Sequence, residues 1–360
     1  MKIAVLGAGS WGTTLAVLLD ENGHRVRLWE FYEELAEALR KDGENKRFLP
    51  GISIPGSVSI ETDMAAALSG ANLVVSAVPS HVTRGVATLA AATGLLGKQT
   101  IVVNAAKGLE EGTLARMSEV LADELPVEPG QICTLAGPSH AEEVSRQMPT
   151  SVVAAGIDAD VIGRVQEAFF RPYFRVYTNS DLVGVEVGVA LKNIIAIAAG
   201  VCDGLGYGDN TKAALLTRGL VEITRLGCAL GARTETFFGL AGIGDLIATA
   251  LSRHSRNPWD SGTGRAGPSC CTRWPRGPGA HKRRARPVES SLPCFFSSFA
   301  WHPIISVSIL HDARSGCDTT DIGRGAPPHH RGVPRGRGRA LRGTRRRRRG
   351  IGGLLHLPVG

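Results

Sequence analysis

Cysteine is scarce in this chain, and its cysteines are not arranged to bind a metal. Seven of the 360 residues are cysteine, and none belongs to a CxxC pair. Cys270 and Cys271 are adjacent, which is not the spacing of a zinc site. Cys133, Cys202 and Cys228 are typical of small buried apolar residues in a reduced, cytosolic protein. We therefore expect no metal site.

The sequence also lacks a recognisable leader and a long apolar run. The first predicted strand begins at Lys2, so there is no room before it for a signal peptide. No uninterrupted apolar run reaches the roughly 18 residues that a membrane span requires. These absences lead us to expect a cytoplasmic protein with no membrane span.

Acidic residues become rare after residue 257. Residues 258–360 hold 19 Lys and Arg against 5 Asp and Glu, whereas residues 1–257 hold 22 against 28. A nucleic-acid-binding arm would be one interpretation, because dense arginine neutralises phosphate. Out-of-frame translation of a GC-rich gene is the interpretation we favour, because the composition changes abruptly in the middle of a motif. We expect residues 258–360 to form an Arg/Pro/Gly-rich tail that is disordered or frameshifted.

The chain begins with an apolar strand, a glycine-rich turn and the start of a helix, in MKIAVLGAGSWGTTLA. Gly7 allows the tight turn, Gly9 lets a pyrophosphate approach the backbone, and Gly12 lets the helix pack closely on the sheet. The helix beginning near Ser10 and Trp11 directs free N–H groups and its positive dipole end at the phosphates. This pattern predicts a dinucleotide site that binds NAD or NADP.

An acidic residue stands where such a site needs one. Residues 25–29 are predicted to form the second strand, and Glu30 follows it, where a carboxylate can accept both ribose hydroxyls. Phe31 comes next, with no basic residue to meet a 2′-phosphate. Because a carboxylate repels a 2′-phosphate, the pair favours NADH over NADPH.

The order of strands and helices predicts an α/β protein with a doubly wound parallel Rossmann sheet over residues 1–180. Short apolar runs give the strands: residues 3–6, 25–29, 73–77, 100–104, 132–136 and 151–155. The sequence then changes to long helices at 183–201 and 211–230, followed by a glycine-broken segment at 241–249. Residues 181–257 are therefore expected to form a mostly helical substrate domain that is C-terminally incomplete.

One lysine lies in the long apolar helix GVEVGVALKNIIAIAAGVCDG. Lys192 could extend its ammonium to the surface or pair with Glu186. Alternatively, a partly desolvated lysine has a lowered pKa and is suited to proton transfer. Asn193 follows it directly, and Asp245 stands in the glycine-rich GLAGIGDL turn, where backbone and ligand can approach closely. We favour the proton-transfer interpretation.

Eight motifs identify a family: GAGSWGTTLA, AVPSH, AAKGLE, GPSHAEEV, GVALKNIIAIAAG, NTKAALLTRGL, GLAGIGDL and SRHSRN. In this order, they closely resemble the bacterial NAD(P)-dependent glycerol-3-phosphate dehydrogenases. The resemblance covers residues 1–257 and stops inside a motif, and the family's closing segment has no counterpart afterwards. It implies hydride transfer between the nicotinamide of the cofactor and C2 of the substrate, which interconverts dihydroxyacetone phosphate and sn-glycerol 3-phosphate and supplies phospholipid synthesis.

The resemblance also implies roles for single residues. Lys192 would be the proton acceptor and donor at C2 of the substrate. Lys107, in AAKGLE, would contact both cofactor and substrate. Gly137 and Ser139 would donate hydrogen bonds to the substrate, and Ala141 would lie under the nicotinamide end of the cofactor.

Two further groups of residues complete the site that the resemblance implies. Asp245 would hold Lys192 and the substrate hydroxyl in register. Ser255, Arg256 and Asn257 resemble a phosphate clamp, for which a guanidinium fork with neutral donors is well suited, and Arg256 would also contact the cofactor. The neighbouring histidines, His140 and His254, are outside the family's catalytic pattern, and we interpret them as flanking polar residues.

Other functions stay open at this point. A related dehydrogenase that places a helical domain after a Rossmann domain would act on a hydroxyacyl or sugar substrate. A protein of another class would be an inactive nucleotide-binding remnant whose basic tail binds RNA. We expect a small-molecule substrate and no specific nucleic acid, and the sequence does not decide whether the chain forms a homodimer.

Overall fold

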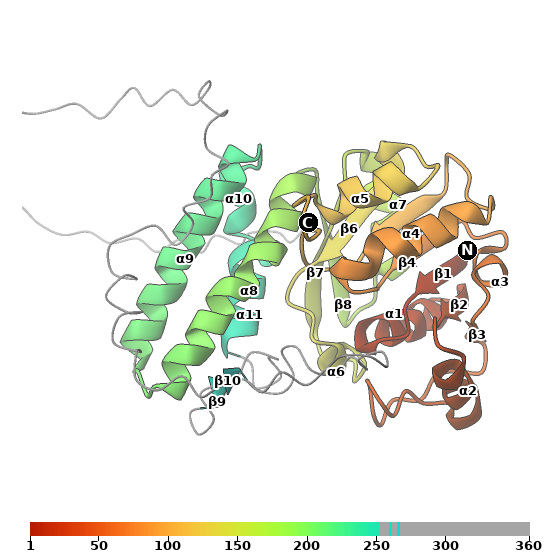
Figure 1. Ribbon diagram of the computed structural model, residues 1–360, viewed down its shortest axis with the longest axis horizontal. Coiled ribbons are helices and arrows are strands. Elements are labelled where there is room, and N and C mark those ends of the chain that lie inside the picture. Colours follow the sequence, from red (N-terminus) through yellow and green to blue (C-terminus); the bar gives the residue numbers. More distant parts are fainter. Residues whose placement is uncertain (252–258, 261–264, 267–360) are drawn as a thin grey trace, which may run out of the picture. The chain divides into compact units, whose positions relative to one another are not determined.

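The computed structural model describes residues 1–251, 259–260 and 265–266 (Figure 1). Ser255, Arg256, Asn257 and His254 lie outside the described residues, so their expected roles stay predictions. Nearly all of residues 258–360 also lie outside the described residues, so the disorder expected for this tail stays a prediction. Within that segment two short strands are described, β9 (Trp259–Asp260) and β10 (Arg265–Ala266), which pair antiparallel.

Eight strands form one sheet in the order β3-β2-β1-β4-β5-β6-β7-β8. The bounds are β1 Lys2–Leu6, β2 Arg25–Trp29, β3 Ser59–Glu61, β4 Leu73–Ser76, β5 Ile101–Asn104, β6 Ile132–Ala136, β7 Thr150–Ala155 and β8 Phe174–Asn179. Neighbouring strands run parallel except β6 and β7, which are antiparallel. The expected doubly wound parallel sheet is confirmed, and the antiparallel β6–β7 pair is a departure that the sequence did not predict.

The two strands that the sequence did not predict lie at the edges of the sheet. β3 has three residues, none of them buried. β8 alternates buried with exposed residues, and the exposed positions include Arg175 and Tyr177. Neither strand therefore shows the short continuous apolar run by which the inner strands were recognised.

Helices cover both faces of the sheet (Figure 1). One core contains side chains of α1 (Ser10–Glu21) and α7 (Ala159–Phe169), and the other contains side chains of α3 (Met64–Leu68), α4 (Thr83–Ala92) and α5 (Met117–Glu124). Two further helices, α2 (Glu33–Asp42) and α6 (Ala141–Val144), follow carboxyl ends of strands. Because the inner strands are covered on both faces, their loops at the carboxyl edge are where a ligand can bind.

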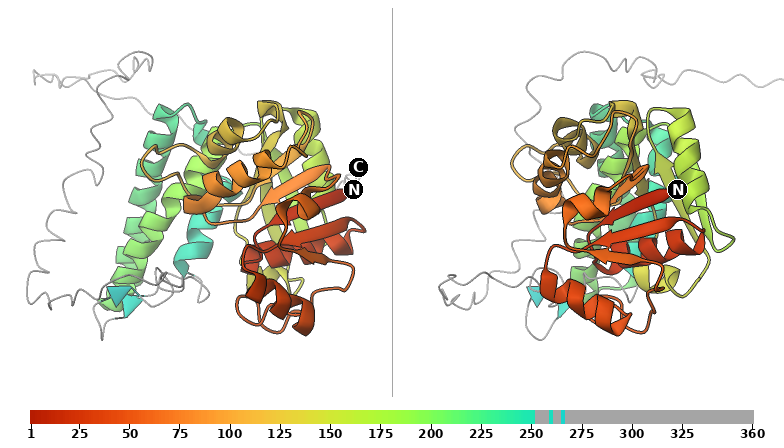
Figure 2. Two further views of the ribbon diagram at one scale, coloured as in Figure 1. Left: turned by 45° about the vertical axis from the view of Figure 1, so that its right-hand side comes forward. Right: turned by 90° about the vertical axis from the view of Figure 1, so that its right-hand side faces the viewer.

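The second part of the chain is helical, as expected. It consists of α8 (Leu182–Gly204), α9 (Asp209–Ala229), α10 (Thr234–Phe237), a π-helical turn η3 (Leu240–Gly244) and α11 (Asp245–Leu251). α8 and α9 lie side by side, with α11 against α8 (Figure 2). Close packing explains part of the glycine content: a Cβ at Gly227 would stand 2.1 Å from the buried ring of Phe237.

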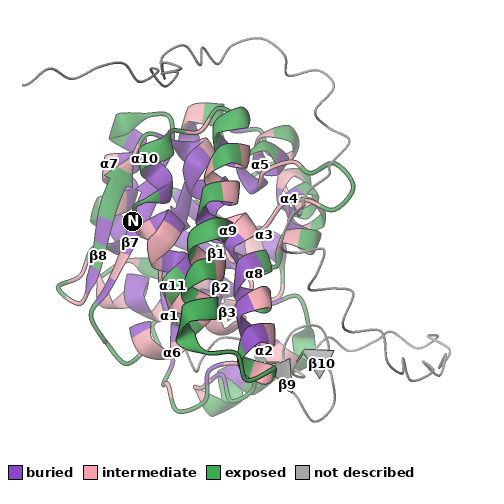
Figure 3. Ribbon diagram, turned by 90° about the vertical axis from the view of Figure 1, so that its left-hand side faces the viewer, coloured by how far each residue is buried: buried purple, intermediate pink, exposed green. Residues whose placement is uncertain are grey.

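One described helix is long and apolar enough to cross a membrane by length and composition. This helix is α8, with a mean hydropathy of 1.9 over its most apolar window, although Glu186 and Lys192 interrupt its apolar run. Within the protein, 67% of that window is buried, and α8 is largely coloured as buried where α9 is largely exposed (Figure 3). Burial by the sheet, α9 and α11 accounts for its apolar composition.

Candidate active site

The glycine turn after β1 has the geometry that its sequence predicts. Gly7 has φ +103°, a conformation that favours glycine. A Cβ at Gly12 would stand 1.9 Å from the carbonyl oxygen of Gly7, so the turn and the helix can meet only without a side chain. A Cβ at Gly9 would meet nothing within 4 Å. The open space at Gly9, before the free N–H groups of Ser10 and Trp11, fits a pyrophosphate.

Glu30 stands at the end of β2 with its side chain largely buried. It is 7% exposed, and its Oε1 accepts a hydrogen bond from the N–H of Tyr32 at 3.1 Å. Burial raises the pKa of this carboxyl. The neighbouring Phe31 is 61% exposed, so its ring is free to contact a ligand that approaches this edge.

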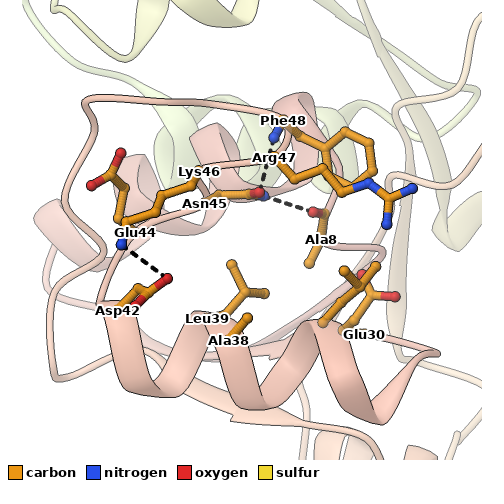
Figure 4. A pocket seen from close by; sticks show the side chains of 11 residues that line it. Ala8, Glu30, Ala38, Leu39, Asp42, Glu44, Asn45, Lys46, Arg47 and Phe48 are labelled. Carbon is orange, nitrogen blue, oxygen red and sulfur yellow. Dashed lines mark hydrogen bonds and ion pairs between the residues drawn. The ribbon is translucent and has the colours of Figure 1, made fainter. Parts of the chain in front are cut away.

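A pocket of about 120 Å³ opens beside Glu30 (Figure 4). Asn45 forms part of its wall and donates to the carbonyl oxygen of Ala8 and to Oγ1 of Thr13, both at 2.8 Å. Arg47 lies over the ring of Phe48, 5.1 Å from its centroid. The sequence reasoning missed these residues because nothing in the loop after α2 marks them as neighbours of the glycine turn.

Lys192 is buried and paired with Asp245. Its side chain is 5% exposed, and its Nζ lies 2.6 Å from Oδ2 of Asp245 and donates to Oγ1 of Thr249 at 2.6 Å. Burial and, secondly, the positive charge of Lys107 lower the pKa of Lys192 to about 7. The lowered pKa is the expected one, whereas pairing of Lys192 with Glu186 is not observed.

Lys107 reaches the same carboxylate from the loop after β5. Its Nζ lies 3.1 Å from Oδ2 of Asp245 and donates to the carbonyl oxygen of Gly137 at 2.8 Å. Asp245 is 2% exposed and begins α11, directly after the π-helical turn. One carboxylate thus joins the ammonium of Lys107, in the loop after β5, to that of Lys192, on α8.

The GPSHA segment forms the loop between β6 and α6. Gly137 has φ +140°, and the hydroxyl of Ser139 donates to its carbonyl oxygen at 3.1 Å. Ala141 is buried and begins α6, where its carbonyl oxygen accepts from Oγ1 of Thr14 in α1 at 3.4 Å. His140 places Nε2 3.4 Å from the carbonyl oxygen of Ala248 in α11. The segment therefore contacts Lys107 through Gly137, α11 through His140 and α1 through Ala141.

Thr249 is a site residue that sequence reasoning missed, although a signal for it existed. It follows Asp245 by four residues, and residues so spaced share one face of a helix. Its hydroxyl donates to the carbonyl oxygen of Asp245 at 2.7 Å and so presents an oxygen lone pair to Lys192. Across the described part of the chain, no group of His, Cys, Asp and Glu is arranged to hold a metal ion.

Known proteins resemble this chain in sequence over both of its parts. Two family models match the chain: NAD-dependent glycerol-3-phosphate dehydrogenase N-terminus over residues 2–161 and its C-terminus over residues 181–261. A glycerol-3-phosphate dehydrogenase [NAD(P)+] of Chlorobium phaeobacteroides is 55% identical over 258 residues, 71% of this chain and 77% of the relative. The enzyme of the same description from Moorella thermoacetica is 56% identical over 256 residues, 71% and 75% of the two chains.

Solved structures lead to the same family. Glycerol-3-phosphate dehydrogenase from Coxiella burnetii matches with a TM-score of 0.68 and 39% identity, over 71% of this chain and 77% of that one. The yeast enzyme matches with a TM-score of 0.63 and 28% identity, over 71% and 78%. This chain belongs to the NAD-dependent glycerol-3-phosphate dehydrogenase family.

Proposed function

We propose that this chain interconverts dihydroxyacetone phosphate and sn-glycerol 3-phosphate with NAD or NADP, and so supplies glycerol 3-phosphate for phospholipid synthesis. The observation that carries the proposal is the buried cluster of Lys192, Asp245 and Lys107. It stands at the carboxyl edge of the sheet that also carries the dinucleotide turn, where ligands bind in this architecture. The bound nicotinamide would supply the hydride.

Lys192 is the group that moves the proton. An ammonium has three N–H donors, and the structure directs two of them at Oδ2 of Asp245 and Oγ1 of Thr249. The third has only a long contact, 3.5 Å to the carbonyl oxygen of Asp245, which the oxygen on C2 of the substrate would replace. With a pKa of about 7, Lys192 exists in both protonation states near neutral pH, so it can serve reduction and oxidation.

Lys107 and Asp245 support this proton transfer electrostatically. The side chain of Lys107 is 25% exposed, so a substrate can reach its ammonium while Asp245 and the Gly137 carbonyl hold it in place. A second positive charge beside the carbonyl stabilises the negative charge that develops on the substrate oxygen during reduction. Ser255, Arg256 and Asn257 are proposed to bind the phosphate, whose binding energy positions the reacting carbon.

The finer assignments are also proposals. Glu30 beside the glycine turn supports a preference for NADH. We place the protein in the cytoplasm, because its cysteines resemble those of a reduced protein. A homodimer is a further hypothesis, and Ile194 and Ile197 on α8 and Val221 on α9 expose apolar surface that a second copy could cover. Sedimentation of the purified protein tests that hypothesis.

The reaction is tested by mixing purified full-length chain, NADH and dihydroxyacetone phosphate and following the loss of NADH absorbance. The expected product is sn-glycerol 3-phosphate without its enantiomer. Dihydroxyacetone, which lacks the phosphate, should react far more slowly if the phosphate is clamped. Faster turnover of a hydroxyacyl or sugar substrate would contradict the proposal. Salt-dependent RNA binding without any turnover would favour the nucleotide-binding remnant instead.

A further inference from the structure

Besides Asp245 on α11, the protein buries the carboxylate of Glu186 on α8, which takes no direct part in the proposed chemistry. Glu186 is 3% exposed and stands six residues before Lys192, about 9 Å along the helix. Its Oε1 accepts from the N–H of Ser118 at 3.0 Å, Oγ1 of Thr134 at 2.8 Å and Nδ2 of Asn104 at 3.4 Å. Its Oε2 accepts from Oγ of Ser118 at 2.6 Å and Nη1 of Arg116 at 2.9 Å.

These five donors come from the two ends of the loop that carries Lys107, and from β6. Asn104 is the last residue of β5, three residues before Lys107, and its side chain also binds the N–H and the carbonyl oxygen of Ala106. Arg116 and Ser118 stand where the loop ends and α5 begins. Both ends of the loop are therefore fixed to one carboxylate on α8.

The loop between these ends is closed on itself. Leu109 and Arg116 form an antiparallel bridge, and the N–H of Glu110 donates to the carbonyl oxygen of Ala115 at 2.9 Å. β6, which supplies Thr134, leads directly into Gly137, the residue whose carbonyl oxygen holds the ammonium of Lys107. The carboxylate thus contacts both ends of the loop that carries Lys107 and the strand that leads to Gly137, and it shares a helix with Lys192.

We infer that Glu186 is a positioning residue that fixes Lys107 in relation to Lys192 by joining the β5–α5 loop and β6 to α8. The inference rests on the proposed function for its catalytic meaning. Glu186 itself is buried from solvent and has its five donors around it, so it reaches no substrate. A neutral hydrocarbon could not replace it, because five donors, one of them a guanidinium, would lose their acceptor.

The obvious variant is Glu186→Gln. Both carboxylate oxygens only accept hydrogen bonds here, so a glutamine must turn its NH₂ group toward at least one donor. A milder variant is Ser118→Ala, which removes one short hydrogen bond and keeps the backbone N–H. The matched control is Glu167→Gln, the same chemical change at an exposed position on α7.

Two readouts separate positioning from mere stability. One is the titration of Lys192, followed by NMR of protein labelled with ¹³C at lysine Cε and assigned with Lys192→Met. The described charged groups that face Lys192 are Lys107 and Asp245, so displacement of Lys107 moves that titration. The other is the turnover of dihydroxyacetone phosphate, with NADH affinity measured separately by fluorescence.

We expect Glu186→Gln to shift the titration of Lys192 and to lower kcat about 10- to 100-fold, because small misplacement of a catalytic group costs up to about 100-fold. NADH affinity in Glu186→Gln, and both kcat and NADH affinity in Glu167→Gln, should stay within about twofold of the wild type. An unshifted titration in folded Glu186→Gln would overturn the inference. If Glu186→Gln does not fold, an unshifted titration of Lys192 in Ser118→Ala would overturn the inference instead. A wild-type chain that turns over no dihydroxyacetone phosphate, yet whose Lys192 titration responds to Glu186→Gln, overturns the proposed function alone.

Discussion

Lys192 and Asp245 form an ion pair that lies almost entirely out of water. Their side chains are 5% and 2% exposed, and Nζ stands 2.6 Å from Oδ2. The carboxylate favours the charged lysine, but burial and the ammonium of Lys107 oppose it more strongly, so the pKa falls to about 7. The site therefore keeps an acid and its conjugate base in balance near neutral pH.

Replacement of Lys192 by methionine tests the proton-transfer role directly. Methionine fills similar space and carries no proton, so kcat should fall at least about 100-fold, the low end for general acid–base catalysis. NADH affinity, measured by fluorescence titration, should barely change. Lys212→Met is the control, because Lys212 pairs with the exposed Asp203 instead of with Asp245. Retention of more than about a tenth of the wild-type turnover would remove Lys192 from the mechanism.

The two directions of the reaction should depend on pH in opposite ways. Reduction needs the ammonium of Lys192, so its kcat should fall as pH rises through about 7. Oxidation needs the neutral amine, so its kcat should rise over the same range. Steady-state rates in both directions between about pH 5 and 9 test this. Parallel profiles for the two directions would exclude Lys192 as the titrating group.

The same pKa shift has a consequence for stability. Lys192 binds a proton less readily in the folded protein than in the unfolded chain, where a lysine has its ordinary pKa of 10.5. Between about pH 7 and 10.5 the unfolded chain binds more protons at this residue, so its contribution to stability rises with pH. Lys192→Met should flatten the pH dependence of the unfolding free energy in this window, as measured by urea denaturation. An equally steep dependence in the variant would contradict the shift.

The sequence was sufficient for the inner strands and for the glycine turn, because these depend on local pattern. Continuous apolar runs mark strands covered on both faces, and Gly7 and Gly12 stand at fixed offsets from the first strand. The edge strands β3 and β8 lack that pattern, so they were not predicted. Each pairs with a strand on the far side of an intervening helix, β2 or β7, and such pairing is not visible along the chain.

The candidate site could be predicted only in part for the same reason. Lys192 stood out because a lysine in an apolar helix is unusual, Asp245 because it stands in a glycine-rich turn, and Lys107 was found through the family's motifs. Nothing in the sequence indicates that Glu186 meets Arg116, since 70 residues separate them and the contact depends on how α8 packs on the sheet. Such tertiary contacts leave no periodicity along the chain.

Replacement of Glu30 by serine should narrow the preference for NADH. The carboxylate stands at the end of β2 beside the pocket, where it repels a 2′-phosphate. Without it, Arg47 on the pocket wall would attract that phosphate more effectively. The measurement is kcat/KM with NADH and with NADPH. Glu34→Ser, at the start of α2, is the control. Equal efficiency with both cofactors in the wild type, unchanged by Glu30→Ser, would show that Glu30 does not select the cofactor.

Two glycines of the turn should respond differently to the same substitution. A Cβ at Gly12 would stand 1.9 Å from the carbonyl oxygen of Gly7, so Gly12→Ala should lower stability by about 1–3 kcal/mol or more. A Cβ at Gly9 meets nothing within 4 Å, and Gly9 has an ordinary φ of −71°, so Gly9→Ala should leave the Tm near that of the wild type. The same Cβ occupies the space proposed for the pyrophosphate, and NADH affinity should therefore fall about tenfold or more. Thermal unfolding and fluorescence titration measure the two effects independently. Wild-type NADH affinity in Gly9→Ala would place the pyrophosphate elsewhere, and an unchanged Tm in Gly12→Ala would show that the turn can move away from the helix.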